Sequence, residues 1–240
     1  MIIDVYEYSN QGGRSYNEDS TGHRIEGENG IFVVADGLGG HAHGEVASAA
    51  AVETVTTDWT PNVPNRMAWF TEEIAKANAN IMGISQQMGD TMKSTIVTLS
   101  IDNGMAVWAH SGDSRLYYFH RGWIAAVTDD HSVAYKKYKA GEIDKDEIAF
   151  DEDQSALLRT LGGADRFEPD VNGWPELLEP GDAFFLCSDG AWEFLKDEEI
   201  LIDLLKAENA KHWAELMMLR MMDRIKGGND NFTLQTIMLS

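Results

Sequence analysis

Residues 97–105 decide the fold and read Val97-Thr98-Leu99-Ser100-Ile101-Asp102-Asn103-Gly104-Met105. The apolar residues Val97, Leu99 and Ile101 alternate with polar ones, which is the pattern of a half-buried strand. Asn-Gly at 103–104 is the strongest two-residue signal for a hairpin, because both central residues of this turn must take positive φ. The stretch therefore predicts a strand that turns back antiparallel into the next one.

The same pattern continues on both sides of this hairpin. Further strands are expected over residues 2–8, 21–26, 31–35, 105–110, 116–120, 123–127, 182–187 and 231–239. Helices are expected over residues 44–59, 65–87, 131–140, 197–207 and 209–225. Strands in meanders with helices in pairs indicate an α+β protein with antiparallel sheets rather than βαβ repeats. No repeat, low-complexity tract or linker interrupts the chain, so residues 1–240 are predicted to form a single domain.

Composition excludes several classes of partner and location. The 240 residues include 19 basic and 40 acidic ones, for a formal net charge of −21. This charge argues against a nucleic-acid partner, because phosphate backbones are bound by clusters of Lys and Arg, and against an anionic membrane surface. Cys187 is the only cysteine, so no intramolecular disulfide can form. The chain begins without a signal peptide and has no apolar run near the ~18 residues that span a bilayer. We therefore expect a cytoplasmic protein.

Four aspartates stand where predicted strands end. Asp36 follows the apolar run 31–35 and Asp189 follows the run 183–187, and each precedes a glycine. Asp113 comes shortly after the strand over 105–110, and Asp230 just before the last strand. An Asp-Gly pair is by itself ordinary turn chemistry, but here each pair leads toward a helix rather than a hairpin. Carboxylates that converge at strand ends repel one another unless cations lie between them, and oxygen-only ligands favour Mg²⁺ or Mn²⁺ over zinc.

Seven short segments resemble, in order, the motifs of the metal-dependent type 2C serine/threonine protein phosphatases, in particular the bacterial branch. The segments are Arg14–Ser20, Val34–His41, Gly112–Tyr117, Thr128–Ser132, Leu158–Gly162, Leu186–Gly190 and Asp230–Thr233. The resemblance covers nearly the whole chain, from about residue 8 to residue 239. It implies a four-layer α-β-β-α sandwich, with two central antiparallel sheets flanked by helix pairs.

The resemblance also implies a centre of two Mn²⁺ or Mg²⁺ ions. Asp36 matches the residue that bridges both ions, and the carbonyl of Gly37 matches a ligand of the second. The remaining ligands that it implies are Asp189 and Asp230 for the first ion, and Asp19 and Glu18, partly through water, for the second. Bound metals lower the pKa of water, so a bridging water would attack the phosphate directly. Arg14 matches the phosphate-binding arginine, whose planar fork suits two phosphate oxygens.

Three positions depart from the family pattern or vary within it. Asp113 matches a ligand of a weaker third ion, but its usual aspartate partner is replaced here by Glu193, which could equally be an acid at a helix start. Some members place a histidine, the proposed general acid, where this chain has Leu38, and neither His41 nor His43 needs to replace it. The segment at about 131–155 matches a variable flap beside the site. Its runs of basic and acidic residues are typical of solvated faces, and the alternative hypothesis is that the flap discriminates phosphoprotein partners.

The sequence therefore predicts a Mn²⁺/Mg²⁺-dependent phosphatase that removes phosphate from phosphoserine and phosphothreonine in proteins and reverses a serine/threonine kinase in signalling. The alternative is a catalytically weak relative that binds phosphoproteins as a signalling scaffold. The partners expected are a phosphorylated protein and a cognate kinase, without nucleic acid or membrane. Nothing in the sequence indicates a dimer, so a monomer is expected.

Overall fold

Two antiparallel sheets of five strands each form the centre of the protein in the computed structural model, which describes residues 1–38, 43–163 and 167–240. The first sheet has the order β1 (Ile3–Asn10), β10 (Phe232–Leu239), β9 (Ala183–Cys187), β6 (Arg115–His120) and β7 (Trp123–Val127). The second has the order β2 (Asp19–Glu26), β3 (Asn29–Asp36), β4 (Ile96–Asp102), β5 (Met105–Ser111) and β8 (Asp170–Gly173). All of the pairings are antiparallel.

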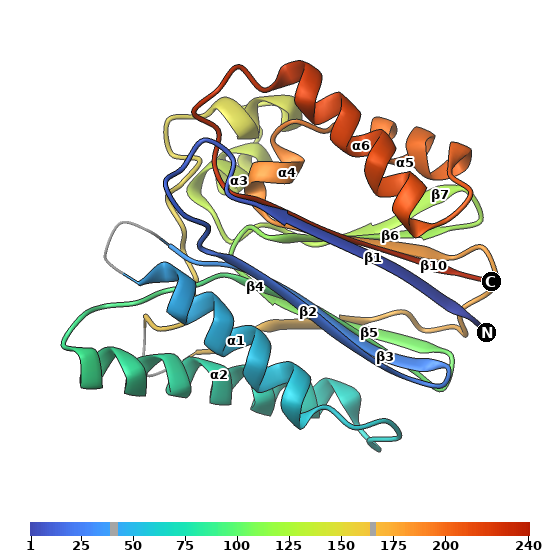
Figure 1. The fold of residues 1–240 in the computed structure, drawn as a ribbon, viewed down its shortest axis with the longest axis horizontal. Coiled ribbons are helices and arrows are strands. Elements are labelled where there is room, and N and C mark those ends of the chain that lie inside the picture. The colour runs from blue at the N-terminus through green and yellow to red at the C-terminus, as the bar shows by residue number, and fades with distance from the viewer. Residues whose placement is uncertain (39–42, 164–166) are drawn as a thin grey trace.

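Helix pairs cover the outer faces of the two sheets (Figure 1). Helices α1 (Gly44–Asp58) and α2 (Arg66–Met88) pack on the second sheet, and α5 (Asp197–Lys206) and α6 (Ala210–Arg224) pack on the first. The shorter elements α3 (Val133–Ala140), η1 (Lys145–Phe150) and α4 (Asp189–Trp192) lie between β7 and α5 in the chain. The predicted four-layer α-β-β-α sandwich is thus confirmed.

Alternation along the central strands explains why the sheets are buried on both faces. On β3, Ile31, Val33 and Ala35 pack against α1 and α2, whereas Phe32 and Val34 face the other sheet. On β9, Phe184 and Leu186 point into the same inter-sheet core, and their neighbours point toward α5 and α6. Successive strand side chains point to opposite faces, so an unbroken apolar run is needed to fill two cores at once.

The hairpin between β4 and β5 has the predicted turn. Asn103 and Gly104 have φ of 52° and 74°, as a two-residue turn of this type requires, and Asp102 pairs with Met105 across it. The chain also contains elements that the sequence analysis did not predict. These are β8, a four-residue edge strand with the weak strand formers Asn172 and Gly173, and η1, a short helix inside the acidic stretch 141–153.

Both termini lie at one end of the sandwich, and the loop after β1 lies at the other (Figure 1). At this second end β3 ends at Asp36, β9 ends at Cys187 and β10 begins at Phe232. The end of the sandwich away from the termini therefore gathers the carboxylates that the sequence placed at strand ends.

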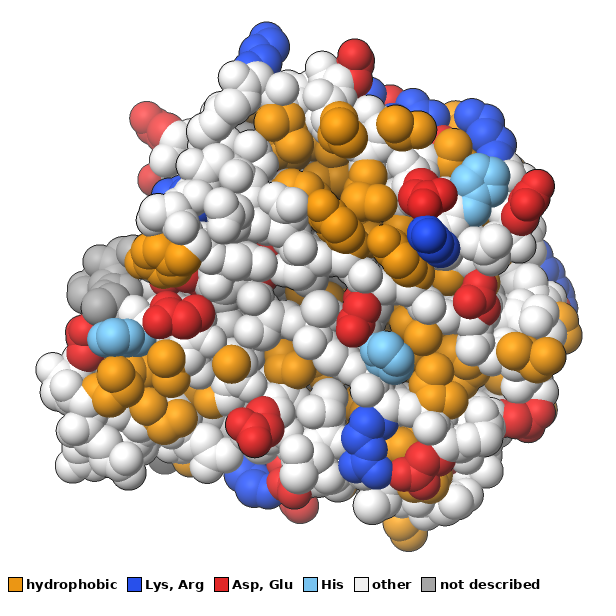
Figure 2. Space-filling model, in the orientation of Figure 1, with side chains coloured by type: hydrophobic (Ala, Val, Ile, Leu, Met, Phe, Trp, Pro, Cys, Tyr) orange, Lys and Arg blue, Asp and Glu red, His pale blue; other side chains and the backbone are white. Residues whose placement is uncertain are grey.

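Figure 2 shows hydrophobic side chains gathered over the helix layer that contains α6, where Leu219 and Met222 are exposed.

The inter-sheet core should dominate stability. Phe184 is fully buried and stacks on Tyr118 with ring centroids 4.6 Å apart. We expect Phe184→Ala to lower the free energy of unfolding by about 3–5 kcal/mol, because it leaves a cavity between the sheets. Phe150→Ala is the matched control, since Phe150 is 83% exposed, and should change stability by no more than about 0.5 kcal/mol. Urea denaturation measures both, and equal effects would contradict this description of the core.

Candidate active site

Four predicted ligands lie where strands of the two sheets end. Asp36 is the last residue of β3 and pairs across the ladder with Asp19, the first residue of β2. In the other sheet, Asp189 begins α4 directly after β9, and Asp230 precedes the neighbouring strand β10. Neither Asp-Gly pair forms a hairpin, as predicted. The sandwich thus brings together carboxylates that are up to 211 residues apart in sequence.

Asp36 lies at the centre of this group. Burial, followed by repulsion from Asp19, Asp189, Asp113 and Asp230, raises the pKa of Asp36 well above its usual range. Burial is also the main cause that raises the pKa of Asp19 to about 7 and that of Asp189 to about 6. The group holds more negative charge than its surroundings stabilise, so it needs protons or cations.

The donor atoms of the group suit a hard cation. Among the described residues, Oδ1 of Asp19 and Oδ1 of Asp113 are buried and have no hydrogen-bond partner. A Cβ at Gly37 would lie 2.2 Å from the carbonyl oxygen of Gly44 and 2.7 Å from that of Glu18, so only glycine fits there. The atoms of this group that could bind a cation are carboxylate oxygens and the carbonyl oxygen of Gly37. Oxygen ligands are those that Mg²⁺ and Mn²⁺ prefer.

Glu18 joins the strand ends to the start of α1. Its carbonyl oxygen accepts hydrogen bonds from the amide of Gly37 at 3.1 Å and from the hydroxyl of Ser48 at 2.5 Å. Its carboxylate accepts a hydrogen bond from the amide of Gly44 at 3.2 Å, and burial raises its pKa. One carboxylate oxygen of Glu18 is thus engaged by the helix start, while the residue itself lies beside Gly37.

Arg14 lies at the open side of the group. Its guanidinium donates a hydrogen bond to Oδ2 of Asp230 at 2.6 Å, and its side chain is 58% exposed. Asp230, Asp189 and Glu18 all raise the pKa of Arg14. A surface pair of this kind contributes little to stability. A guanidinium held at the edge of a carboxylate cluster and open to solvent can instead bind an incoming anion.

Asp113 and Glu193 approach the group from two further segments. Asp113 is buried in the turn after β5, and burial together with repulsion from Asp189 raises its pKa well above the usual range. Glu193 lies one helical turn after Asp189 and accepts a hydrogen bond from Gln154. Burial raises the pKa of Glu193 to about 8. Both acids thus lie close to Asp189, and Glu193 already contacts the 131–155 segment.

A family model described as "Protein phosphatase 2C" matches residues 8–223. The chain belongs to the protein phosphatase 2C family. It is 30% identical over 230 residues to the "Serine/threonine phosphatase stp" of Listeria welshimeri, covering 92% of this chain and 89% of that protein. It is 28% identical over 193 residues to "Protein phosphatase PhpP" of Streptococcus pneumoniae, covering 78% of each chain.

Solved structures agree with this assignment. The S. agalactiae serine/threonine phosphatase superposes with a TM-score of 0.85 at 27% identity and full coverage of both chains. The catalytic domain of the serine/threonine protein phosphatase PstP, solved in complex with two manganese ions, gives a TM-score of 0.83 at 25% identity, covering 99% of this chain and 98% of that one. The predicted family and activity are therefore confirmed: the protein is a bacterial-type, metal-dependent serine/threonine protein phosphatase, and the scaffold alternative is not favoured.

The phosphatase contains supporting residues to which the sequence analysis gave no role. Ser188 donates a hydrogen bond from its hydroxyl to Asp19 at 2.7 Å. The side chain of Asn231 accepts from the amide of Glu18 and donates to the carbonyls of Gln11 and Tyr16. Ser188 and Asn231 lie next to Asp189 and Asp230 in the motifs, and this adjacency was the available signal.

Thr95 is a third such residue, and the sequence offered no sign of it. Its hydroxyl accepts from the amide of Asp36 at 3.0 Å and is 2.7 Å from the hydroxyl of Ser114. Thr95 therefore connects the end of β3 to the turn that carries Asp113.

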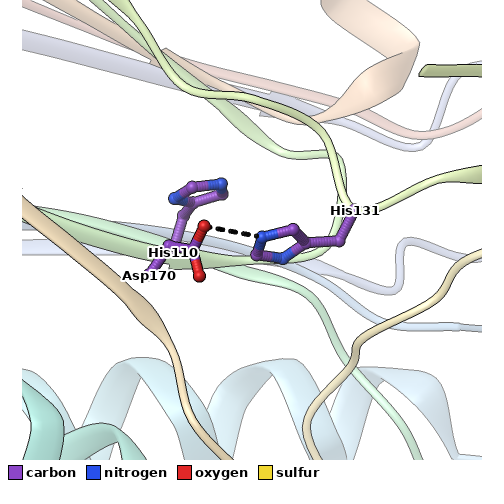
Figure 3. Close-up of side chains that lie close together, drawn as sticks. All are labelled: His110, His131 and Asp170. Carbon is purple, nitrogen blue, oxygen red and sulfur yellow. Dashed lines mark ion pairs between the residues drawn. The ribbon is translucent and has the colours of Figure 1, made fainter. Parts of the chain in front are cut away.

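The histidines that come together in the structure are not the ones considered in the sequence analysis. His41 lies outside the described residues. His43 is the N-cap of α1, and its Nδ1 lies 3.6 Å from Oε1 of Glu45. His110, His131 and Asp170 instead come together, with one potential ligand atom from each within 4.8 Å of the others (Figure 3). None of these three was predicted as a site residue.

The raised pKa values of the phosphatase predict how its stability depends on pH. Asp19 and Asp189 have an unfolded pKa of about 3.9 and folded values of about 7 and 6. Between these limits the folded protein holds protons that the unfolded chain has lost, so stability falls as pH rises. We expect the melting temperature of the chelator-treated protein to fall from pH 5 to pH 8, and Mn²⁺ to raise it more at pH 8 than at pH 5.

Asp36→Asn is the control for this measurement, because it removes the central charge of the group. The melting temperature of this variant should depend less steeply on pH than that of the parent protein. Equal slopes for the two proteins would show that the general negative charge of the chain, rather than this group, causes the effect.

Proposed function

We propose that the carboxylate group holds two divalent cations, Mn²⁺ or Mg²⁺, and that phosphoester hydrolysis takes place there. Asp36 would contact both ions, Asp189 and Asp230 the first, and the Gly37 carbonyl with Asp19 and Glu18 the second. The observation that carries this proposal is the set of mutually raised pKa values around Asp36, since cations would relieve the same repulsion. The buried carboxylate oxygens of Asp19 and Asp113, which have no hydrogen-bond partner among the described residues, support it.

When bound, such a pair of ions supplies a hydroxide nucleophile at neutral pH and neutralises charge on the phosphate. The residues of the chain bind and orient the substrate. Arg14 would donate its guanidinium hydrogens to two phosphate oxygens and would share its present partner, Asp230, with a cation. Cys187 is fully buried and burial raises the pKa of its thiol, so a cysteine nucleophile is not proposed.

We propose a weaker third cation between Asp113 and the region of Glu193. Oδ1 of Asp113 is buried and has no hydrogen-bond partner in the described part of the chain. Repulsion from Asp189 raises the pKa of both Asp113 and Glu193. Glu193 has a longer side chain than aspartate and already accepts a hydrogen bond from Gln154. A cation here would therefore compete with the 131–155 segment for Glu193.

We also propose that residues 1–240 form one catalytic domain with a flap at about 131–155. Pairing of β1 with β10 joins the two ends of the chain in one sheet. The flap contains α3 and η1, and Lys145 and Lys196 form ion pairs that join η1 to the start of α5. Lys145 and Asp146 of the flap line one pocket together with Glu193, which suits a role in discriminating phosphoprotein substrates.

The protein acts on phosphoproteins, as its family does, and the finer biology is a proposal. We propose a cognate serine/threonine kinase, a cytoplasmic location, and no nucleic-acid or membrane partner, in line with the net charge of −21. Among the helices of the described ranges, none has both the length and the apolar character that a bilayer-spanning helix needs. A monomer is proposed, because nothing in the sequence indicates a dimer.

Asp36→Asn tests the metal assignment most directly. Removal of the central charge should lower manganese-dependent turnover of an aryl phosphate by more than about 100-fold, the upper range for losing a residue that only supports a ligand. Asp223→Asn is the matched control on α6 and should leave turnover unchanged. Circular dichroism checks that both variants fold, and a folded Asp36→Asn variant with near-parent turnover would overturn the assignment.

Arg14 variants test phosphate binding separately. Hydrogen bonds to charged groups contribute about 1.5–3 kcal/mol, so Arg14→Ala should lower kcat/KM by roughly 10- to 150-fold. The kcat/KM of Arg14→Lys should lie between those of the parent protein and Arg14→Ala, because lysine keeps the charge but not the planar fork. Arg121→Ala, which removes another exposed arginine paired with an acid, is the control. If Arg14→Lys and Arg14→Ala were both as active as the parent, Arg14 would not bind the phosphate.

A further inference from the structure

The turn that carries Asp113 is held by hydrogen bonds to the backbone on both sides of the aspartate. On the far side, the indole N–H of Trp192 donates to the carbonyl oxygen of Asp113 at 2.9 Å. On the near side, the amide of His131 donates to the carbonyl oxygen of Gly112 at 2.9 Å, and the amide of Gly112 donates to Nδ1 of His131 at 3.2 Å. His131 thus engages both backbone groups of the residue that precedes Asp113.

These contacts define the protonation state of the His131 ring. Because Nδ1 accepts a hydrogen bond from a backbone amide, it carries no proton, and in the neutral ring the proton is on Nε2. Nε2 lies 3.3 Å from Oδ2 of Asp170 (Figure 3), and in the described part of the chain it has no hydrogen-bond partner, so Asp170 acts on it through charge alone. Asp170 is itself held by Arg159, whose guanidinium donates to Oδ1 at 2.5 Å.

The neighbouring ring of His110 favours the same state. The two rings stack with centroids 4.6 Å apart and planes inclined by 14°. Nε2 of His110 is 2.8 Å from the carbonyl oxygen of Asp129 and must donate to it. Burial lowers the pKa of both histidines, and His110 lowers that of His131 further. Both rings are therefore neutral at pH 7.

Proximity alone makes His110, His131 and Asp170 a candidate metal site, but their geometry does not fit one. A ligating imidazole binds through an unprotonated nitrogen while its other nitrogen donates a hydrogen bond. His110 meets this condition, but His131 does not, because its Nδ1 is an acceptor and its Nε2 carries the proton. The lone pairs of two nearly parallel rings also point along parallel planes and do not converge on one ion.

We propose instead that His131 is a positioning residue for the reaction: its unprotonated Nδ1 holds the Gly112 amide and so sets the direction of the Asp113 carboxylate, while the negative charge of Asp170 beside Nε2 favours the proton on that nitrogen. This rests on the proposed function, in which Asp113 belongs to the cation site. The position of this turn also affects Asp36. Ser114 in the same turn contacts Thr95, and the Thr95 hydroxyl accepts a hydrogen bond from the amide of Asp36. His131 is 8% exposed and need not touch the substrate.

Nitrogen-15 NMR of the unaltered protein tests the tautomer without any substitution. The expected spectrum shows a pyridine-type Nδ1 and a pyrrole-type Nε2 for His131, with slow exchange of the Gly112 amide proton. A protonated Nδ1 would overturn the proposal. Titration with Zn²⁺ that shifted the ring nitrogens of both His110 and His131 would also overturn it, in favour of a metal site.

Two substitutions separate the two ring nitrogens. In His131→Asn the side-chain oxygen can take the place of Nδ1 and accept the Gly112 amide, whereas in His131→Gln the amide group reaches toward Asp170 in place of Nε2. We expect the Asn variant to keep slow exchange at Gly112 and most of the turnover. The Gln variant should exchange faster at Gly112 and need about tenfold more Mn²⁺ for half-maximal turnover, as is usual when a supporting residue is lost, with KM for substrate unchanged.

His212→Gln, on the surface of α6, is the matched control and should behave like the parent protein. Equal losses in the Asn and Gln variants would indicate that His131 only fills space, and would overturn the proposal. Failure of the proposed function has a different signature, namely an Asp36→Asn variant that turns over normally. The Gly112 exchange rate reports on His131 in either case.

Discussion

Mutual repulsion among the carboxylates around Asp36 is the constraint on which the rest of the structure depends. Two unit charges 4 Å apart interact by about 4 kcal/mol at an effective dielectric constant of 20, and four neighbouring aspartates raise the pKa of Asp36 by repulsion. A chain that had only to fold would not gather them. Strand ends from both sheets nevertheless converge on this point, and Ser188, Asn231 and Thr95 hold the backbone around it. The repulsion is thus kept in place by the sandwich, and cations can relieve it.

The fold also explains why the backbone, rather than the acidic side chains themselves, sets the positions of the candidate ligands. Asp36 ends β3, Asp113 lies in the turn after β5 and Asp189 begins α4. Hydrogen bonds that involve the main chain hold each of them in place. Gly37 allows the chain to pass within van der Waals contact of Gly44 and Glu18. Each ligand can therefore point inward while its neighbours complete the two cores, as the alternation on β3 and β9 shows.

Local patterns predicted much of this architecture. Alternation over 97–101, the Asn103-Gly104 turn and the apolar runs before Asp36 and Asp189 were sufficient for the antiparallel sheets and for the strand-end aspartates. Contacts between distant segments were not predictable in this way. Thr95 looks like any strand residue, and β8 has weak strand formers, yet β8 carries Asp170 to His131. The role of His131 depends on which ring nitrogen accepts a hydrogen bond, and only the folded chain determines that.

Charge at the site explains why the Asp113 turn needs such support. If Glu18, Asp19, Asp36, Asp113, Asp189 and Asp230 were all ionised, two divalent cations and Arg14 would leave one negative charge, and a phosphate would meet a negative site. The net charge of the whole chain matters less, because distant charges are screened beyond about 8 Å at physiological salt. Asp113 is the acid that shifts this balance: a proton there makes the site neutral, and a third divalent cation there makes it positive. The buried position of Asp113, between Trp192 and His131, favours both outcomes over a bare carboxylate.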